Sequence, residues 1–226
     1  MSTERSGEKP DGEPLREELA RLRGEFAALQ ARHDAQIVEM RHRAFNHLQM
    51  VVSLIRLRLR RTQNDETRRQ LTALESYIVA LSLLQRHLDT EGTGTDFSTY
   101  LKDQAALWQP LLAERNIAVA VNAEAISVAA AKAVPLALIV NELVTNAYKH
   151  AFPDGRGGTV RVALRAQEPP WLVLSVTDDG IGMHGDVPPE SVGQTLIKIL
   201  AAQIGAQVSR NASGAGTSVH LRFTPE

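Results

Sequence analysis

The chain has 226 residues, 43% of them hydrophobic, and a formal net charge of −1. This length has room for two small domains, and the apolar fraction is sufficient for a core. A nucleic-acid-binding protein normally carries a basic imbalance, so nucleic acid is excluded as the expected partner. The lack of cysteine excludes disulfides and thiolate sites and fits a reducing compartment. Because no apolar run approaches the ~20 residues of a membrane span and no signal-peptide core is present, we expect a cytoplasmic protein.

Residues 1–13 are polar and contain Gly and Pro, which predicts a disordered tail. The segment that follows has the alternating four-and-three spacing of a coiled coil, carried by Leu15, Leu19, Leu22, Phe26 and Leu29. This segment is either the first part of a long dimer helix or a parallel coiled coil that transmits a signal into the helix that follows. The second interpretation predicts a separate sensor protein as a partner of the coil.

The helix is predicted to continue to about Arg61. Its inner apolar stripe consists of Phe45, Leu48, Val52, Ile55 and Leu59. His42 lies one position off the backward continuation of this stripe, so we expect it at the edge of the core, within reach of solvent. A neutral imidazole nitrogen in that position is a good nucleophile near physiological pH. Glu39 lies one turn earlier on the same face, where its carboxylate could orient the imidazole proton.

Residues 62–66 carry turn and cap signals, with Asn64 or Asp65 as the expected N-cap. A second helix is predicted from there to about Leu88. Two antiparallel helices with broad apolar faces cannot bury those faces alone, so we expect a homodimer that forms a four-helix bundle. The coiled coil and this helical hairpin together are assigned to residues 14–92.

Residues 93–226 are predicted to form a second domain, an α/β sandwich with helices on one face of a mostly antiparallel sheet. The expected helices are 97–112, 135–152 and 192–204, and the expected strands are 117–121, 126–129, 158–166, 171–176, 206–210 and 218–223. Trp108 and Trp171 are expected in the core.

The helix predicted over Pro135–Phe152 carries polar residues on one face. Glu142 and Asn146 are four residues apart and therefore stack, with Lys149 and His150 one turn later. An amide oxygen is a hard ligand suited to Mg²⁺, which shares phosphate oxygens with its nucleotide, and lysine supplies compensating charge. Alone, this pattern also fits an ordinary amphipathic core helix.

A second motif lies about thirty residues downstream, where a β-rich run ends. Asp178, Gly180 and Gly182 form a D-x-G-x-G sequence at the point where the strand breaks into a loop. Glycines let the backbone approach a ligand, and a carboxylate at a strand end can accept from an exocyclic amine. The two motifs in this order indicate a nucleotide site.

These two motifs resemble the N-box and G1 box of the nucleotide-binding fold shared by gyrase, chaperone and mismatch-repair ATPases and histidine kinases, the GHKL type. A third motif, EMRHRAFNHLQ from Glu39 to Gln49, is similar to the H-box of the bacterial histidine kinases whose pattern is H-R-x-x-N-x-L-Q. By this resemblance His42 is the phosphate acceptor. His47 stands where the family usually has asparagine, and Arg41 stands where a second histidine is common.

The resemblance also implies roles in binding Mg·ATP. Asp178 would contact the adenine amine, and Thr217 would help to bind adenine. Asn146, together with Asn141, would hold Mg²⁺. Lys149 and His150 would meet the phosphates, and backbone amides from Gly193 onward could cradle them. Gly180 and Gly182 would let the backbone approach the nucleotide. Residues 183–193 would form the lid, and Glu142 would either assist the acceptor histidine or structure the site.

The predicted function is that of a dimeric protein histidine kinase. It would autophosphorylate His42 from Mg·ATP and pass the phosphoryl group to an aspartate of a response regulator. Three alternatives stay open: a histidine phosphotransfer protein with a degenerate nucleotide fold, a gyrase-type ATPase module, and a scaffold that only binds nucleotide.

Overall fold

The computed structural model describes residues 13–88, 94–182 and 192–226. The chain forms two compact units, residues 1–43 and 44–226. Nearly all of the predicted tail, the predicted domain boundary at 92–93 and most of the predicted lid lie outside the described residues.

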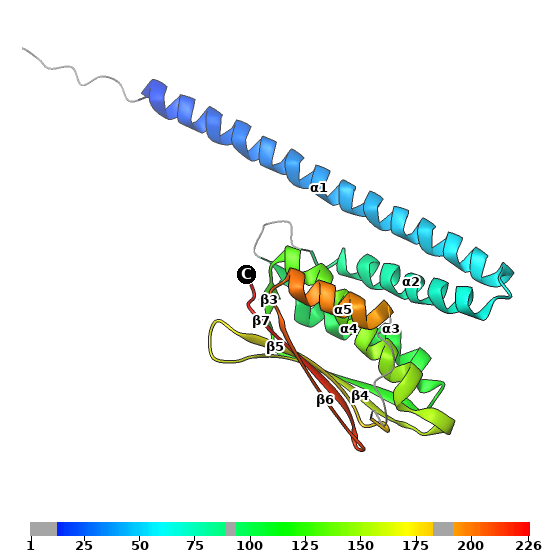
Figure 1. Ribbon diagram of the computed structural model, residues 1–226. Coiled ribbons are helices and arrows are strands. Elements are labelled where there is room, and N and C mark those ends of the chain that lie inside the picture. The colour runs from blue at the N-terminus through cyan, green and yellow to red at the C-terminus, as the bar shows by residue number, and fades with distance from the viewer. Residues whose placement is uncertain (1–12, 89–93, 183–191) are drawn as a thin grey trace, which may run out of the picture. The chain divides into compact units, whose positions relative to one another are not determined.

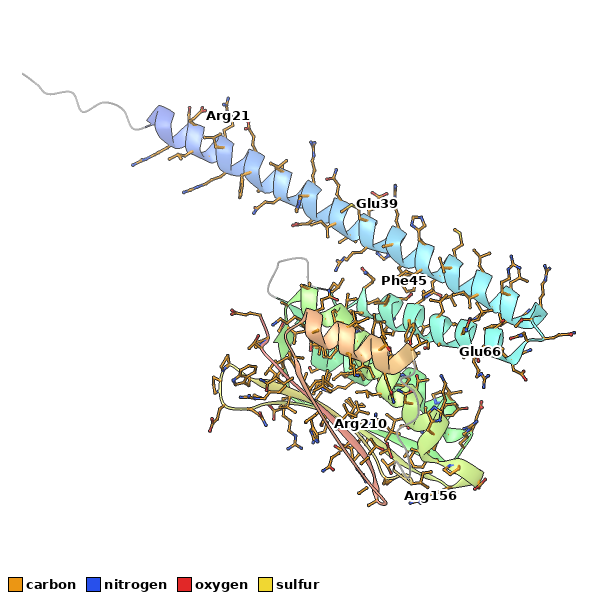
Figure 2. The ribbon with its side chains drawn as sticks, in the orientation of Figure 1. Arg21, Glu39, Phe45, Glu66, Arg156 and Arg210 are labelled. Carbon is orange, nitrogen blue, oxygen red and sulfur yellow. The ribbon has the colours of Figure 1, made fainter. Side chains whose placement is uncertain are left out.

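The first helix, α1, runs from Glu13 to Arg61, which confirms the single long helix expected through the H-box. In its first part the heptad side chains Leu19, Leu22, Phe26 and Leu29 are all exposed. Charged pairs one turn apart support the helix, including Arg21 with Glu18 at 3.0 Å and Arg43 with Glu39 at 2.6 Å. Figure 2 labels Arg21 and Glu39 on this helix. Within residues 13–43, therefore, the apolar stripe of the heptad faces solvent.

The second helix, α2, runs from Asp65 to Leu84 and begins at the predicted cap. The side chain of Asn64 accepts a hydrogen bond from the backbone N–H of Thr67 at 2.8 Å. The helix ends four residues before the predicted Leu88, because the chain tightens into a turn with i to i+3 bonds such as His87 N–H to Leu84 C=O. Its last turns carry the buried residues Ala80, Ser82, Leu83 and Leu84.

Five strands of residues 44–226 form one sheet in the order β2-β4-β5-β7-β6. Strands β2 and β4 pair in parallel and every other neighbouring pair is antiparallel, so the mostly antiparallel sheet is confirmed. The bounds are β2 Ile117–Ala123, β4 Gly158–Ala166, β5 Leu172–Asp178, β6 Gln207–Ser213 and β7 Gly216–Phe223. Two short strands, β1 Thr95–Asp96 and β3 Ser127–Val128, pair separately.

Three helices lie on one face of this sheet (Figure 1). They are α3 Phe97–Ala113, α4 Ala130–Asn146 and α5 Val192–Gln203. Alternate residues of the central strands, such as Leu174 and Leu221, are fully buried in the core between sheet and helices, together with Leu136 and Ile139 of α4. The residues between them face away from the helices, as expected for an antiparallel sheet with one solvated face.

The N-box helix differs from its prediction at both ends. It begins at Ala130, five residues before Pro135, and it ends at Asn146. A π-helical turn, η1 Ala147–Ala151, follows and carries Lys149 and His150, and a short 3-10 turn, η2 Pro153–Gly155, comes after it.

Of the two tryptophans, Trp108 is buried as predicted, whereas Trp171 is not a core residue. Trp171 is only partly buried, and the guanidinium of Arg222 lies 4.0 Å from its ring centroid. A polar contact with a charged side chain explains why this indole stays near the surface.

We expect the N-cap of α3 to make stability depend on pH. Burial raises the pKa of Asp96, but hydrogen bonds from Thr99 and Ser98 outweigh it and lower that pKa to about 2. The folded state therefore favours the carboxylate, so the cap stabilises the fold above the ordinary pKa and loses its effect as the pH falls toward 2. Asp96→Ala should lower the free energy of unfolding by about 1 kcal/mol near neutral pH, and urea unfolding should show this difference shrinking in acid. A difference that is constant with pH would contradict the charged cap.

Candidate nucleotide-binding site

The last residue of β5, Asp178, joins two segments of the predicted nucleotide site. Its side chain is 8% exposed. Its Oδ1 accepts hydrogen bonds from the backbone N–H groups of Gly180 at 3.1 Å and Thr217 at 3.2 Å. Among the described residues, Oδ2 has no hydrogen-bond partner. The carboxylate thus holds the D-x-G-x-G turn against the start of β7 and keeps one oxygen available.

The D-x-G-x-G turn and the start of β7 approach neighbouring backbone so closely that Gly182 and Gly216 cannot be replaced by residues with a Cβ unless that backbone moves. Gly182 has φ +68°, and a Cβ added there would overlap the carbonyl oxygen of Ser213. Gly216 has φ +122°, and its added Cβ would overlap the carbonyl oxygen of Asp178. Strain and contact both favour glycine at these positions. The D-x-G-x-G turn is therefore packed backbone against backbone on the β6–β7 hairpin, an arrangement that we call the glycine cradle.

The other side of the turn is held by the end of the N-box region. The N–H of Ile181 donates to the carbonyl of Ala151 at 2.9 Å, and a Cβ added at Gly180 would overlap Ala151. This contact brings the π-helical turn next to the D-x-G-x-G turn. The two motifs that are thirty residues apart in sequence therefore meet, as predicted.

The neighbouring carboxylate, Asp179, has structural partners instead. Its Oδ1 accepts from the backbone N–H of Thr159 at 2.7 Å, and its Oδ2 lies 3.9 Å from Arg161. The guanidinium of Arg156, labelled in Figure 2, donates to the Asp179 carbonyl at 3.1 Å. The two consecutive aspartates thus have different environments, and Asp178 is the one beside the glycine cradle.

The polar residues that end the N-box region are accessible. Asn146 is half-buried at the last residue of α4, and Lys149 and His150 are exposed on the π-helical turn. Partial burial, followed by the positive charge of Lys149, lowers the pKa of His150 below its ordinary value. At neutral pH this histidine is therefore neutral, and Lys149 supplies the positive charge of the turn.

Asn141 occupies a different environment from Asn146. It is 2% exposed, and its Oδ1 accepts from the indole N–H of Trp108 at 3.3 Å. Its Nδ2 donates to the hydroxyl of Ser76 on α2 at 3.1 Å. The amide oxygen that would bind Mg²⁺ is thus engaged inside the protein, so we retain only Asn146 as a candidate ligand.

Of the candidate catalytic residues, His42 is exposed on the first part of α1. The carboxylate of Glu39 is paired with Arg43 at 2.6 Å, which differs from the predicted contact with the imidazole. Glu142 belongs to the other unit, is 4% exposed and accepts a hydrogen bond from the hydroxyl of Tyr77. Gly193 lies beside it, since an added Cβ there would overlap Glu142 Oε2.

The contact of Ser76 and Tyr77 with the N-box helix could not be predicted from the sequence. These residues lie 65 positions before their partners, and helical periodicity predicts which face is apolar but not which polar residues meet across it. A tyrosine within the otherwise aliphatic face of the second helix was the only available signal.

The residues present fit a magnesium ion that is shared with phosphate. In the described parts of the chain, no group of three or more His, Asp or Glu side chains could hold a metal ion alone. Mg²⁺ in nucleotide sites keeps waters and phosphate ligands and needs only one or two protein oxygens. Asn146, the half-buried last residue of α4, can supply one. Within residues 13–88, 94–182 and 192–226, no helix is long and apolar enough to cross a membrane.

Two family models match the chain. Residues 39–107 match a histidine kinase family, and residues 131–226 match the histidine kinase-, DNA gyrase B- and HSP90-like ATPase family. The first match includes the H-box, and the second includes the N-box and the D-x-G-x-G turn. The chain therefore belongs to the histidine kinases of the H-R-x-x-N-x-L-Q group, with a GHKL-type ATP-binding domain.

Within that class the chain is similar to sensor kinases. It is 32% identical over 197 residues to blue-light-activated histidine kinase 2 of Erythrobacter litoralis, a match that covers 83% of this chain and 56% of that protein. It is 29% identical over 200 residues to sensor histidine kinase PdtaS of Mycobacterium tuberculosis, covering 84% and 39%. The chain thus spans about half the length of these curated relatives, or less.

A solved structure gives the same result for the fold. The histidine kinase domain of the E. litoralis EL346 blue-light-activated histidine kinase is similar with a TM-score of 0.64 and 29% sequence identity, and the match covers 85% of this chain and 92% of that one. The helices followed by a mixed α/β domain are therefore those of a histidine kinase with a GHKL catalytic domain.

We predict that Gly182→Ala weakens ATP binding by about tenfold or more, because a side chain there must displace the β6–β7 backbone that forms the cradle. Gly205→Ala is the matched control: its φ of +66° imposes the same backbone strain, but no atom lies within 4 Å of the added Cβ. Calorimetric titration with a non-hydrolysable ATP analogue measures both variants. Equal affinities would mean that the close contact at Gly182 does not shape the site.

Proposed function

We propose that the chain is an autophosphorylating protein histidine kinase that transfers the γ-phosphoryl group of ATP to His42. The observation that carries this proposal is the D-x-G-x-G turn anchored by Asp178. Its carboxylate is anchored on Oδ1 by two backbone amides, while Oδ2 stays available beside a cradle that only glycine backbone can form. An available carboxylate oxygen is a suitable acceptor for the exocyclic amine of adenine.

The triphosphate would extend from the adenine site toward the end of the N-box region. Lys149 would offset phosphate charge, and the neutral His150 would donate a hydrogen bond from its ring. Backbone amides at Gly193, near the N-terminus of α5, suit the same anion. Thr217, whose amide is bonded to Asp178, would contact the base.

Asn146 would hold Mg²⁺, which when bound neutralises charge on the β- and γ-phosphates. The residues of this chain supply the rest by positioning. Glu142 would act on the acceptor imidazole once its carboxylate is released from Tyr77, and Glu39 would need to leave Arg43 to reach that imidazole.

In the transfer, an unprotonated ring nitrogen of His42 attacks the γ-phosphorus in line. The new N–P bond forms while the bond from phosphorus to the β,γ-bridging oxygen breaks, and ADP leaves with the electron pair of that bond. The exposure of His42 allows this approach. The phosphohistidine would then be attacked by an aspartate oxygen of a response regulator, which regenerates His42.

The proposed assembly is a homodimer. Exposed apolar side chains on α1, such as Leu54 and Leu57, and Leu74 on α2 suit a four-helix bundle made from two hairpins. A separate sensor protein bound through the heptad of residues 15–40 is the proposed source of input. Deletion of residues 1–35 without any change in regulated activity in cells would contradict that partner.

The direct test is incubation with γ-labelled ATP and Mg²⁺, followed by acid and alkali treatment. We expect label on the protein that is lost in acid and survives alkali, and we expect His42→Ala to abolish it. His47→Ala is the matched control, since His47 is also exposed on α1 and should leave labelling intact.

The other outcomes separate the alternatives. ATP binding without any label would favour a nucleotide-binding scaffold, and no binding at all would favour a histidine phosphotransfer protein. ATP hydrolysis that survives His42→Ala without a labelled protein would favour a gyrase-type ATPase module. Label retained in His42→Ala but lost in His47→Ala would move the acceptor to His47.

A further inference from the structure

Two hydrogen bonds connect α2 to the N-box helix α4 outside the nucleotide cradle. The hydroxyl of Tyr77 donates to Oε1 of Glu142, and Nδ2 of Asn141 donates to the hydroxyl of Ser76. Ser76 and Tyr77 are consecutive, as are their partners Asn141 and Glu142. The four residues therefore form one paired polar contact, which we call the latch.

The latch encloses a carboxylate that would otherwise need water. Glu142 is 4% exposed, and burying an ionised carboxylate without a hydrogen-bond donor is strongly unfavourable. The Tyr77 hydroxyl is such a donor. Burial, the hydrogen bond and the negative charge of Glu142 raise the pKa of Tyr77, so the phenol keeps its proton at neutral pH.

The second oxygen of the same carboxylate is closed in from the opposite side. A Cβ added at Gly193, at the start of α5, would overlap Glu142 Oε2. Glu142 is thus held between Tyr77 of the hairpin and the backbone of α5. In this arrangement only 4% of Glu142 is exposed, so little of its carboxylate is open to an acceptor side chain.

The position of the latch along α2 suggests how it opens. The residues after it, Ala80, Leu83 and Leu84, are buried, and the two leucines join the main core. The first turns of α2 before it are largely exposed. The polar contact therefore lies where the firmly packed part of α2 ends, and polar contacts of this kind are typical of interfaces that separate.

We propose that Tyr77 is an autoinhibitory latch: it holds α2 on the N-box helix and keeps Glu142 occupied, so that phosphoryl transfer requires the latch to open. This inference deepens the proposed function and rests on it, because it makes the release of Glu142 from Tyr77 a step that precedes transfer to the acceptor histidine. Opening would occur about the last turns of α2, where Leu83 and Leu84 stay in the core.

The test removes the hydroxyl group of Tyr77. Tyr77→Phe keeps the ring but leaves the buried Glu142 without this donor, which favours the separated arrangement in which water can reach the carboxylate. We expect amide hydrogen exchange in the first turns of α2 to become about tenfold faster and autophosphorylation to become several-fold faster. Ser76→Ala should shift both quantities in the same direction, by less.

Tyr100→Phe is the matched control. Tyr100 is fully buried, and its hydroxyl has no hydrogen-bond partner among the described residues, so this change removes the same atom without removing a bond. It should leave α2 exchange and autophosphorylation unchanged.

Two results would overturn the latch. Unchanged exchange in Tyr77→Phe would mean that the contact does not hold α2. Slower autophosphorylation with an unchanged KM for ATP would mean that Tyr77 positions Glu142 for the reaction instead of restraining it. Because exchange does not depend on activity, it also tests the hold on α2 if the wild-type chain takes no label, an outcome that would count against the kinase function itself.

Discussion

The candidate nucleotide site depends on one buried carboxylate that accepts hydrogen bonds from two backbone amides. Asp178 bonds to Gly180 within its own turn and to Thr217 on the neighbouring strand, so one side chain determines the path of both segments. Hydrogen bonds to an ionised group are stronger than neutral ones, and this pair is shielded from water. The glycine cradle adjoins it, since Gly216 approaches Asp178 just beyond the last pair of the β5–β7 ladder, Thr177 with Ser218.

The same helix that contributes to the nucleotide site also faces the hairpin. Asn146 is the last residue of α4, whereas Asn141 and Glu142 form hydrogen bonds with Trp108, Ser76 and Tyr77. The last turns of the N-box helix therefore carry both the candidate ligand and the contact with the hairpin. Under the proposed latch, movement of the hairpin would free the carboxylate of Glu142 without a change in the glycine cradle.

Much of this could be predicted from the sequence. Apolar periodicity predicted the sheet, and the D-x-G-x-G spacing predicted the strand end at Asp178. The start of α4 was missed because Ala129 provides no side-chain cap and the alanines after it carry no polar period, so Pro135 stood out as the first signal. The pairing of Tyr77 with Glu142 was missed because helical periodicity does not predict which polar residues meet in the folded protein. For the same reason Asn141 was assigned to the metal, although its amide oxygen accepts from Trp108.

The measurement that tests this account most directly is nucleotide binding by the Asp178→Asn and Asp179→Asn variants. Calorimetric titration with a non-hydrolysable ATP analogue and Mg²⁺ gives the affinity of each. An asparagine at 178 can still accept the Gly180 and Thr217 amides through Oδ1, but it presents an amide N–H₂ to the adenine amine in place of Oδ2. The account predicts a loss of affinity of about tenfold or more for Asp178→Asn, a fold that is retained, and little change for Asp179→Asn. Equal affinities, or a loss confined to Asp179→Asn, would contradict it.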